Sequence, residues 1–503
     1  MGLDSAHLAG VHRHITEVTP DTLRSEAAAL LADGFRLALV AGHDDGPTLR
    51  IVYLFLAGAP DRRRELQVSV PRSRPEIPSL AALSYPASRF ERELHDLLGI
   101  VPVDHPLPRR LVRHAHWPAG WYPLRRDAGP PPPFTDGDSF PFLQVDGAGV
   151  YEIPVGPVHA GLIEPGHFRF SVVGETIIKL KARLWFTHRG IEKMFEGRDA
   201  LDSIALAERI SGDTAAAHAL AHSLAVEDAL GITLPDDGHR LRAMLVELER
   251  LYNHAADLGA LANDVGFGLA NAHAQRIREQ LLRLNDSITG HRLLRGGISP
   301  GGAELRVMPY AAELRCIADD LTEITELTLA NSVVRDRFTG TAALSLEHAR
   351  ELGCLGYVAR ASGLDIDARR DHPSLALPIH PVLGSDGDVL ARYLARRDEF
   401  TASVELICAL GVELDRRTSV SGTRPTPGPF APTRSGVGIV EGWRGTIVHR
   451  VELDRENRIT RAKIVDPSWF NWPALPVALA NTIVPDFPLT NKSFNLSYAG
   501  NDL

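Results

Sequence analysis

The hydrophobic and polar positions of residues 1–128 predict a small α+β unit. Residues 22–32 carry apolar side chains at helical spacing, and two strand-like apolar runs follow at 35–41 and 48–56. The Asp-Asp-Gly sequence at 44–46 is typical of a tight turn, so the two runs are expected to pair as a β-hairpin.

A Pro- and Gly-rich stretch separates this unit from the rest of the chain. Before it, residues 89–100 have the composition of a charged helix that ends at Gly99. Four consecutive prolines at 130–133 then forbid a helix and favour an extended path. We therefore place a linker at 129–149.

The remaining residues, 150–503, are predicted to be mainly helical, with strands at both ends. Alternating apolar positions at 168–184 indicate a hairpin, and a helical pattern extends from 199 to 412. Strand-like runs return at 438–448 and 458–465. The predicted fold class is therefore α+β: a small α+β domain, a linker, and a mainly helical bundle domain with flanking β-hairpins.

Composition and charge narrow the classes of function. The chain has 503 residues, of which 44% are hydrophobic, and a formal net charge of −9. This acidic balance argues against a nucleic-acid partner. No apolar run approaches the ~20 residues of a membrane span, and no signal peptide is recognisable. We expect a cytoplasmic protein.

Cysteine usage limits the metal chemistry of this chain. The three cysteines, Cys316, Cys354 and Cys408, are far apart in the sequence and form no CxxC pair. An iron–sulfur cluster normally takes about four thiolates, so none is expected in this chain. Scattered cysteines in a reduced compartment are expected to be small buried side chains.

Short motifs in the first unit resemble the C subunit of respiratory complex I. They are the acidic segment 91–100, the His-Pro pair at 105–106, the Arg-Arg pair at 109–110, and the segment 123–127.

Motifs in the second unit resemble the large subunit of membrane-bound, energy-converting NiFe hydrogenases, a relative of the complex I D subunit. They lie at 156–170, 188–193 and 441–445. A C-like unit fused ahead of a D-like unit is the arrangement of group 4 hydrogenase large subunits of the hydrogenase-3/4 or formate hydrogenlyase type. The resemblance implies the fold of those subunits.

The resemblance also implies four positions at which the family holds nickel and iron with two CxxC pairs. These positions fall on Ser211, Thr214, Ser497 and Gly500, so all four thiolates are missing. Hydroxyl groups are weak ligands for low-valent nickel and iron, and glycine has no side chain. We therefore expect no metal in this chain.

By the same resemblance, polar and ionisable side chains line the vacated cavity. Glu164 matches the hydrogenase glutamate implicated in proton transfer, and we expect it to be buried beside the segment that carries Arg209. A buried Glu in such a setting can relay protons, because its pKa moves towards neutrality. Alternatively, these charges form a structural ion-pair network. The other side chains expected there are His159, His167, His188, Arg189 and Asp213.

In complex I the corresponding cavity holds a quinone headgroup, through a His on the early hairpin and a Tyr beside the first ligand position. The Tyr position is Gly212 here, whereas both His159 and His167 belong to the hairpin region. Quinone is thus the cofactor that the resemblance leaves open for this chain.

By resemblance, the chain is a metal-free, hydrogenase-large-subunit-like component of a membrane-associated complex related to complex I. The expected partners are a small iron–sulfur protein similar to the B subunit of complex I, and antiporter-like membrane subunits. These partners would hold the chain at the cytoplasmic face of the membrane. Two alternatives stay open: an active oxidoreductase subunit that passes electrons to quinone or another acceptor, and a non-redox scaffold of an antiporter-like module.

Overall fold

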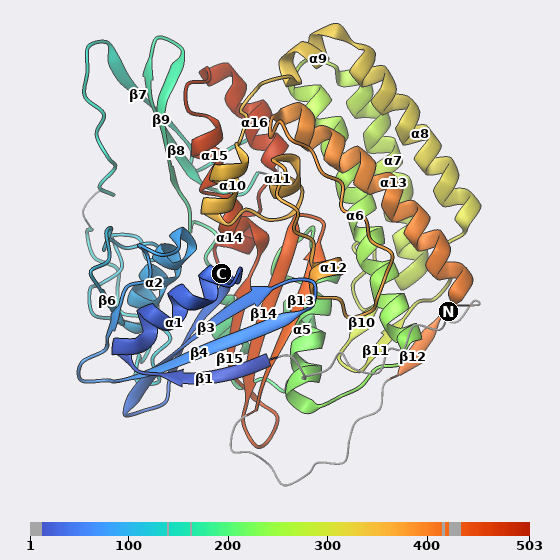
Figure 1. Ribbon diagram of the computed structural model, residues 1–503. Helices are drawn as coiled ribbons and strands as arrows, with labels where there is room; N and C mark the ends of the chain where they lie inside the picture. The colour runs from blue at the N-terminus through green and yellow to red at the C-terminus, as the bar shows by residue number, and fades with distance from the viewer. Residues whose placement is uncertain (1–12, 138–139, 161–162, 415–417, 422–433) are drawn as a thin grey trace.

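The computed structural model describes residues 13–137, 140–160, 163–414, 418–421 and 434–503. Figure 1 shows the N-terminal unit, in blue, beside a long antiparallel sheet in the centre of the molecule. A bundle of long helices covers the other side of that central sheet, and a smaller sheet stands at the upper left. The molecule is thus a mixture of helices and sheets, which confirms the predicted α+β class.

The N-terminal unit is built on a four-stranded sheet. Its elements are β1 (Arg13–Val18), α1 (Pro20–Ala32), β2 (Arg36–Asp44), β3 (Thr48–Ala57), β4 (Arg62–Pro71), β5 (Glu76–Pro78), α2 (Tyr85–Leu98) and β6 (Val101–Val103). The strand order is β1-β4-β3-β2, and the predicted hairpin is the antiparallel pair β2 and β3. Helix α2 ends where Gly99 takes a left-handed φ of 72°, a conformation that suits glycine.

Between the two units, the described part of 129–149 contains no helix or strand, and most of its residues are exposed. The two units nevertheless pack against each other. The Phe90 ring of α2 stacks on Trp469 with ring centroids 4.9 Å apart, and Lys463 Nζ lies 2.8 Å from a Glu93 carboxylate oxygen. One hydrophobic core therefore continues from the first unit into the second.

The hairpin predicted at 168–184 belongs to a three-stranded antiparallel sheet. Its strands are β7 (Val150–Val155), β8 (His167–Val173) and β9 (Thr176–Arg183). Strict alternation along β9 would bury Ile178 together with Leu180. Ile178 is instead exposed, because a register shift opposite Ser171 and Val172 turns Ile177 inward.

Long helices make up most of 199–412, as predicted. The short helix α3 (Ile191–Phe195) precedes this region, whose helices are α4 (Ile204–Ala207), α5 (Ala215–Leu230), α6 (Asp236–Asp264), α7 (Gly268–Thr289), α8 (Ala311–Ala330), α9 (Ser332–Phe338), α10 (Leu346–Leu352), α11 (Gly356–Ala361), α12 (Ala368–Asp371) and α13 (Val389–Glu413). The short strands β10 (Ile298–Ser299), β11 (Gly302–Glu304) and β12 (Ser419–Ser421) pair beside them. The apolar stripe of α6, which includes Leu241, Leu245 and Leu248, is fully buried in the core that α7 and α13 share.

The C-terminal part of the chain forms the central sheet and a cap of short helices. These elements are β13 (Arg434–Gly442), β14 (Gly445–Leu453), β15 (Ile459–Val465), α14 (Pro467–Asn471), α15 (Ala474–Ala478), η1 (Val484–Asp486), α16 (Phe487–Phe494) and α17 (Tyr498–Asn501). The single strand predicted at 438–448 is wrong, because the chain reverses at Trp443 and Arg444 and forms a hairpin. β13 is buried from Gly436 onward and β14 is buried throughout, so no exposed polar stretch marks the turn in the sequence.

Helix α5 lies directly on β13, and the small residues of both elements allow their backbones to come close. A Cβ atom at Gly438 would lie 2.0 Å from the carbonyl oxygen of Ala221, and one at Gly436 would lie 2.0 Å from that of Ala225. Only glycine fits at these two positions of β13. The contact fixes α5, which begins immediately after Thr214, against the central sheet.

Two sequence expectations concern burial and membrane contact. Cys354 and Cys408 are buried as expected, whereas Cys316 is exposed, because it lies on the solvent side of α8. Within the described ranges, the structure contains no helix that is long and apolar enough to cross a membrane.

Candidate functional site

The four positions that the resemblance assigns to metal ligands lie close together, although two of them are at the C-terminal end of the chain, with Ser497 capping helix α17 and Gly500 inside it. Ser211 Oγ and Ser497 Oγ are 2.8 Å apart, within hydrogen-bond distance. The backbone N–H of Gly500 donates to Ser497 Oγ at 2.8 Å. Thr214 joins the same group through Asp213, to which both Ser211 and Thr214 donate.

An ion pair between Asp213 and Arg444 dominates the electrostatics of this cluster. Both oxygens of Asp213 lie 2.7 Å from guanidinium nitrogens of Arg444. Burial favours the neutral carboxyl group, but Arg444 and the hydrogen bonds from Thr214 and Ser211 lower the pKa of Asp213 from 3.8 to about 2. The carboxylate is therefore ionised at neutral pH.

Arg444 reaches Asp213 because the tight turn of the central hairpin points at the cluster. Trp443 Nε1 donates to the carbonyl oxygen of Asp213 and to Thr214 Oγ1, both at 3.1 Å. Arg444 Nε donates to the carbonyl oxygen of Asn495 at 2.6 Å. The turn thus ties the loop before α5 to the segment before α17.

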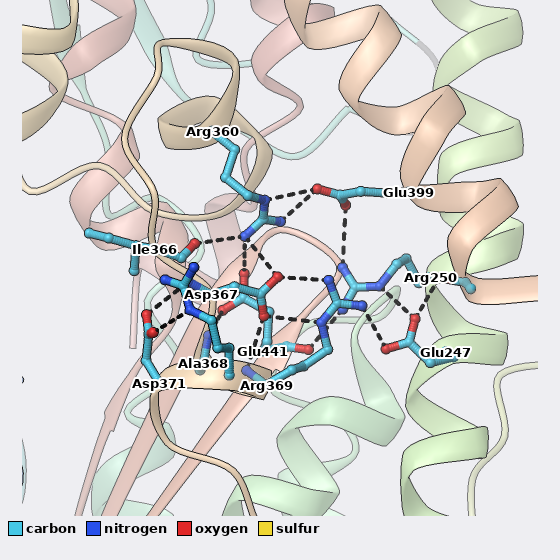
Figure 2. Close-up of polar contacts among 12 residues, drawn as sticks. Glu247, Arg250, Arg360, Ile366, Asp367, Ala368, Arg369, Asp371, Glu399 and Glu441 are labelled. Atoms are coloured by element: carbon cyan, nitrogen blue, oxygen red, sulfur yellow. Dashed lines mark hydrogen bonds and ion pairs between the residues drawn. The ribbon is translucent and has the colours of Figure 1, made fainter. Parts of the chain in front are cut away.

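A buried network of charges supports this turn from below (Figure 2). Arg250 on α6 donates to the carbonyl oxygens of Glu441 and Gly442 at 3.0 and 3.2 Å, directly before the turn. Glu247 holds the Arg250 guanidinium at 3.0 Å. The backbone that presents Arg444 is therefore anchored to α6.

Arg360 of α11 is the centre of the same network. Its guanidinium nitrogens lie 2.7 Å from Glu399 of α13 and 2.7 Å from Glu441 of β13, and 3.5 Å from Asp367. Arg369 of α12 then pairs with Asp367 at 2.7 Å. Four parts of the chain thus meet at these charges, namely α6, residues 360–371, α13 and β13, as Figure 2 shows.

The direction of the pKa shift differs among the acids of this network. Burial and the neighbouring Asp367 raise the pKa of Glu441 above its ordinary value. Burial would do the same to Glu399, but Arg360 and His254 hold its pKa well below the ordinary range. Glu441 is thus the member of the network best suited to carry a proton.

Behind Gly500 lies a second buried polar group, centred on Asp466. A Cβ atom at Gly500 would lie 2.6 Å from the carboxyl carbon of Asp466, so this carboxyl group fills the space where a side chain would begin. His218 Nε2 lies 3.2 Å from Asp466 Oδ2, and His218 Nδ1 lies 3.0 Å from His449 Nε2. His218 is fully buried.

Glu164, the leading candidate from sequence, is placed differently from the prediction. It is exposed, and its Oε2 accepts the backbone N–H of Ala499 at 3.0 Å. Arg209 does not contact it, because this side chain is 54% exposed and donates to the carbonyl oxygen of Ala205 in its own helical turn. The predicted burial of Glu164 beside the Arg209 segment is therefore wrong, although Glu164 does lie next to Gly500.

The other predicted residues divide into two groups. His188 lies within hydrogen-bond distance, 3.2 Å, of the Asp502 carbonyl oxygen beside α17, and Arg189 donates to the carbonyl oxygens of Arg209 and Ile210. Both residues thus border the serine cluster. His159 and His167 instead bond to backbone within their own loop, to Gly166 O at 2.7 Å and Gly156 O at 3.1 Å.

Sequence reasoning missed Arg444 and Asp466 as members of the site. Arg444 stands inside the motif at 441–445, which was a signal for it, but its partner Asp213 is 231 positions away. Nothing around Asp466 in the sequence indicates a function. Gly212, at the position of the quinone-binding Tyr, is exposed and has open space around its Cα.

In the part of the chain that the structure describes, no three His, Cys, Asp or Glu side chains are grouped as metal ligands would be. The cluster offers hydroxyl groups, one ionised carboxylate and one guanidinium. Such groups can bind a polar ligand or hold and transfer protons.

Comparison with known families places this geometry in context. Residues 16–132 match the 30 Kd subunit of respiratory-chain NADH dehydrogenase, and residues 264–424 match its 49 Kd subunit. Residues 189–261 match nickel-dependent hydrogenases. Formate hydrogenlyase subunit 5 of Escherichia coli strain K12 is 31% identical over 457 residues, which cover 87% of this chain and 79% of that protein. The chain belongs to this family of fused complex I 30 kDa/49 kDa-like proteins.

Other members of the family are similarly related. Hydrogenase-4 component G of the same bacterium is 32% identical over 444 residues, covering 85% of this chain and 76% of that protein. The C/D subunit of the NADH-quinone oxidoreductase of Bacteroides thetaiotaomicron is 31% identical over 406 residues, covering 73% of this chain and 75% of that protein. The resemblance to group 4 hydrogenase large subunits inferred from the motifs is confirmed.

A solved structure supports the same fold. A chain of the membrane-bound sulfane sulfur reductase, an archaeal respiratory membrane complex, superposes with a TM-score of 0.63 at 25% identity. The match covers 71% of this chain and 99% of that one. The relatives of this chain are therefore subunits of membrane-bound complexes of the hydrogenase and complex I type.

Proposed function

We propose that this chain is a metal-free, hydrogenase-like subunit of a membrane-associated complex related to complex I, with a polar cavity around Asp213 in place of a NiFe centre. The observation that carries the proposal is the packing at Gly500. Its Cα faces the carboxyl group of Asp466 so closely that a cysteine side chain could not begin there without displacing that group.

The contacts of the other three positions support the proposal. Ser211, Thr214 and Ser497 are buried and use their hydroxyl groups within the protein, on each other and on Asp213. Hydroxyl groups that are satisfied in this way have little tendency to bind a soft metal.

The chemistry left to the cavity is the binding and transfer of protons. Arg444 keeps Asp213 ionised, so Asp213 is a fixed negative charge rather than a relay at neutral pH. Glu164 at the rim is exposed to solvent, and it is connected to α17 through the N–H of Ala499. We propose that movement of α17 couples this rim to partner subunits.

The partners follow from the family. We propose a small iron–sulfur subunit that faces the cavity and antiporter-like membrane subunits that hold the chain at the cytoplasmic face of the membrane. Any electrons would then arrive from the cluster of the small subunit. This arrangement agrees with relatives that are parts of membrane-bound complexes.

Metal content tests the proposal directly. The chain should be expressed with its neighbouring subunits in cells that contain hydrogenase maturation factors, and a nickel-dependent hydrogenase should be purified in parallel as a positive control. We expect no stoichiometric nickel in this chain by elemental analysis. A content near one nickel per chain would overturn the proposal.

Quinone reduction is a second candidate, favoured by the identity with the C/D subunit of NADH-quinone oxidoreductase. It predicts that a short-chain quinone binds the assembled complex and that Asp213→Asn weakens this binding. Unchanged binding in that variant would place the quinone elsewhere. A small partner protein without cluster cysteines would favour the non-redox scaffold over both candidates.

A further inference from the structure

A pocket of about 380 Å³ lies outside the serine cluster, between the linker and the sheet β7–β9. Its volume falls within the range of ~300–1,000 Å³ that small-molecule sites occupy. The residues that line it are His114, Phe140, Pro141, Phe142, Gln144, His167, Arg169, Arg183 and Phe186.

The floor of the pocket is a cationic face of the sheet. His167 and Arg169 alternate along β8, and Arg183 pairs with His167 across the strands, so the three side chains share one face. Because neighbouring strands lie only about 5 Å apart, these three side chains are close together on the face.

The roof of the pocket is the linker segment 140–144. Lys181 Nζ donates to the carbonyl oxygen of Leu143 at 2.7 Å, which holds the segment over the sheet. Phe142 covers the Arg169 guanidinium at 4.4 Å, and Phe140 covers that of Arg183 at 4.8 Å. The linker is therefore folded against cations rather than free in solution.

Positive groups outnumber negative ones on this face, where one carboxylate, that of Glu152 on β7, pairs with both Arg169, at 3.5 Å, and Lys181. Arg183 is only 5% exposed and donates to the backbone carbonyl oxygens of Leu111, Val112 and Arg113. No carboxylate lies within ion-pair distance of it in the described ranges, and Asp96 and Asp502 act on it only at longer range. Buried charges are normally paired, so Arg183 is a group that an anion in the pocket would stabilise.

Other groups in the pocket show the same excess of positive charge. Burial and the nearby Arg183 lower the pKa of His114 to about 4. Arg169 Nε, Arg183 Nε and His167 Nε2 are buried and have no hydrogen-bond partner in the protein. No acidic side chain lines the pocket among the residues that the structure describes.

We propose that this pocket binds a small organic carboxylate. Arginine recognises a planar carboxylate well, through charge-assisted hydrogen bonds. The Phe140, Phe142 and Phe186 rings provide an apolar wall for the body of such a ligand, and the small movement of the roof that exposes the arginine Nε atoms accompanies binding. The proposal rests on this pocket alone and does not depend on the proposed function.

Benzoate is a suitable probe, because it combines a carboxylate with a ring, and benzamide is its neutral control of the same shape. Isothermal titration of the full chain should show saturable benzoate binding and binding of benzamide at least about tenfold weaker, as expected for a charge-assisted contact. Histidine NMR should show that benzoate raises the pKa of His114. Sulfate in place of benzoate tests whether a tetrahedral anion is preferred.

Two variants locate the site. Arg169→Gln should weaken benzoate binding at least about tenfold, whereas Lys179→Gln, an exposed lysine on β9 outside the pocket, should not change it. Gln144→Glu changes an exposed side chain and places a negative charge in the pocket, so it should also weaken binding without disturbing the fold. Thermal melting of each variant checks that it is folded.

The proposal is overturned by any of four results. Three of them are the absence of saturable benzoate binding, equal binding of benzamide, which would indicate a merely apolar pocket, and unchanged binding in the folded Gln144→Glu variant. The fourth is tighter binding of sulfate than of benzoate, which would reject the carboxylate as the ligand class.

Discussion

Asp213 is the residue on which the polar contacts of the serine cluster converge. Its side chain accepts hydrogen bonds from Ser211, Thr214 and Arg444, and its backbone carbonyl oxygen accepts one from Trp443. Each donor comes from a segment that carries or supports one of the positions that the resemblance assigns to metal ligands. The cluster is therefore held together by one ion pair and its surrounding hydroxyl groups.

The contact between Ser211 and Ser497 can be tested by a cross-link. In the double variant Ser211→Cys/Ser497→Cys, the two sulfur atoms replace oxygens that are 2.8 Å apart, close to the ~2.05 Å of a disulfide bond. We expect mild oxidation to remove both new thiols, as measured by thiol titration after denaturation. Each single variant serves as a control, and two titratable new thiols after oxidation would contradict the geometry.

The variant Glu164→Gln can distinguish a proton-linked role of this side chain from a structural one. Glu164 is exposed, and in Glu164→Gln the amide oxygen can still accept the N–H of Ala499, so we expect an unchanged melting temperature. Loss of ion-pumping activity by the assembled complex with normal assembly would support the proton-linked role. Full activity would falsify it, and a clear loss of stability would show that Glu164 is structural.

His222 should make the protein sensitive to acid. Burial lowers its pKa from 6.5 to about 4 in the folded state, so the unfolded chain binds a proton first as the pH falls. The free energy of unfolding is therefore at its full value above pH 6.5. Between pH 6.5 and 4 it falls by about 3 kcal/mol. Urea unfolding of His222→Gln should show a weaker loss over this range, whereas the exposed His273→Gln should behave like the native chain.

At the scale of elements, the contact of α5 with β13 decides where the site forms. The alanine-rich helix can approach the strand only because Gly436 and Gly438 have no side chains. Since α5 begins directly after Thr214, this contact also determines how far the Ser211 loop lies from Arg444 at the end of β13.

Gly438→Ala tests this close approach. Its Cβ atom would meet the Ala221 carbonyl oxygen of a rigid helix, so we expect a loss of about 1–3 kcal/mol in the free energy of unfolding. The control is Gly411→Ala in α13, where the nearest atom would be 4.0 Å away and alanine favours the helix. Equal stability of the two variants would show that α5 can move away from the strand.

At the scale of the whole molecule, the two units behave as one body joined by an exposed linker. Charged contacts reinforce their common core: Arg450 lies 3.2 Å from Glu65, and Arg50 lies 2.7 Å from Glu452. Separating the two units would expose apolar surface and break these ion pairs. Both changes cost free energy.

Limited proteolysis can distinguish a linker from a domain boundary between independent bodies. We expect a protease to cut within 129–149, where the described residues are exposed and lack secondary structure. The two fragments should separate on a denaturing gel but elute together in native size-exclusion chromatography. Separate elution would show that the shared core is weak, and preferred cleavage inside either unit would argue against the linker.

Local patterns in the sequence determined much of the fold. The hairpin at 44–46, the stop at Gly99 and the buried stripe of α6 follow from turn chemistry, glycine conformation and helical periodicity, which act over a few residues. The motifs likewise indicated the family, and the comparisons confirm it.

Only the tertiary structure decided which polar groups meet. Arg444 pairs with Asp213 across 231 positions, whereas Glu164 accepts a hydrogen bond from α17 and the half-exposed Arg209 donates to Ala205. Such contacts depend on how helices and strands pack, for example on the glycines of β13 that admit α5. Side-chain periodicity encodes which face of an element is buried, but the partner across that face is set by the packing of the whole chain.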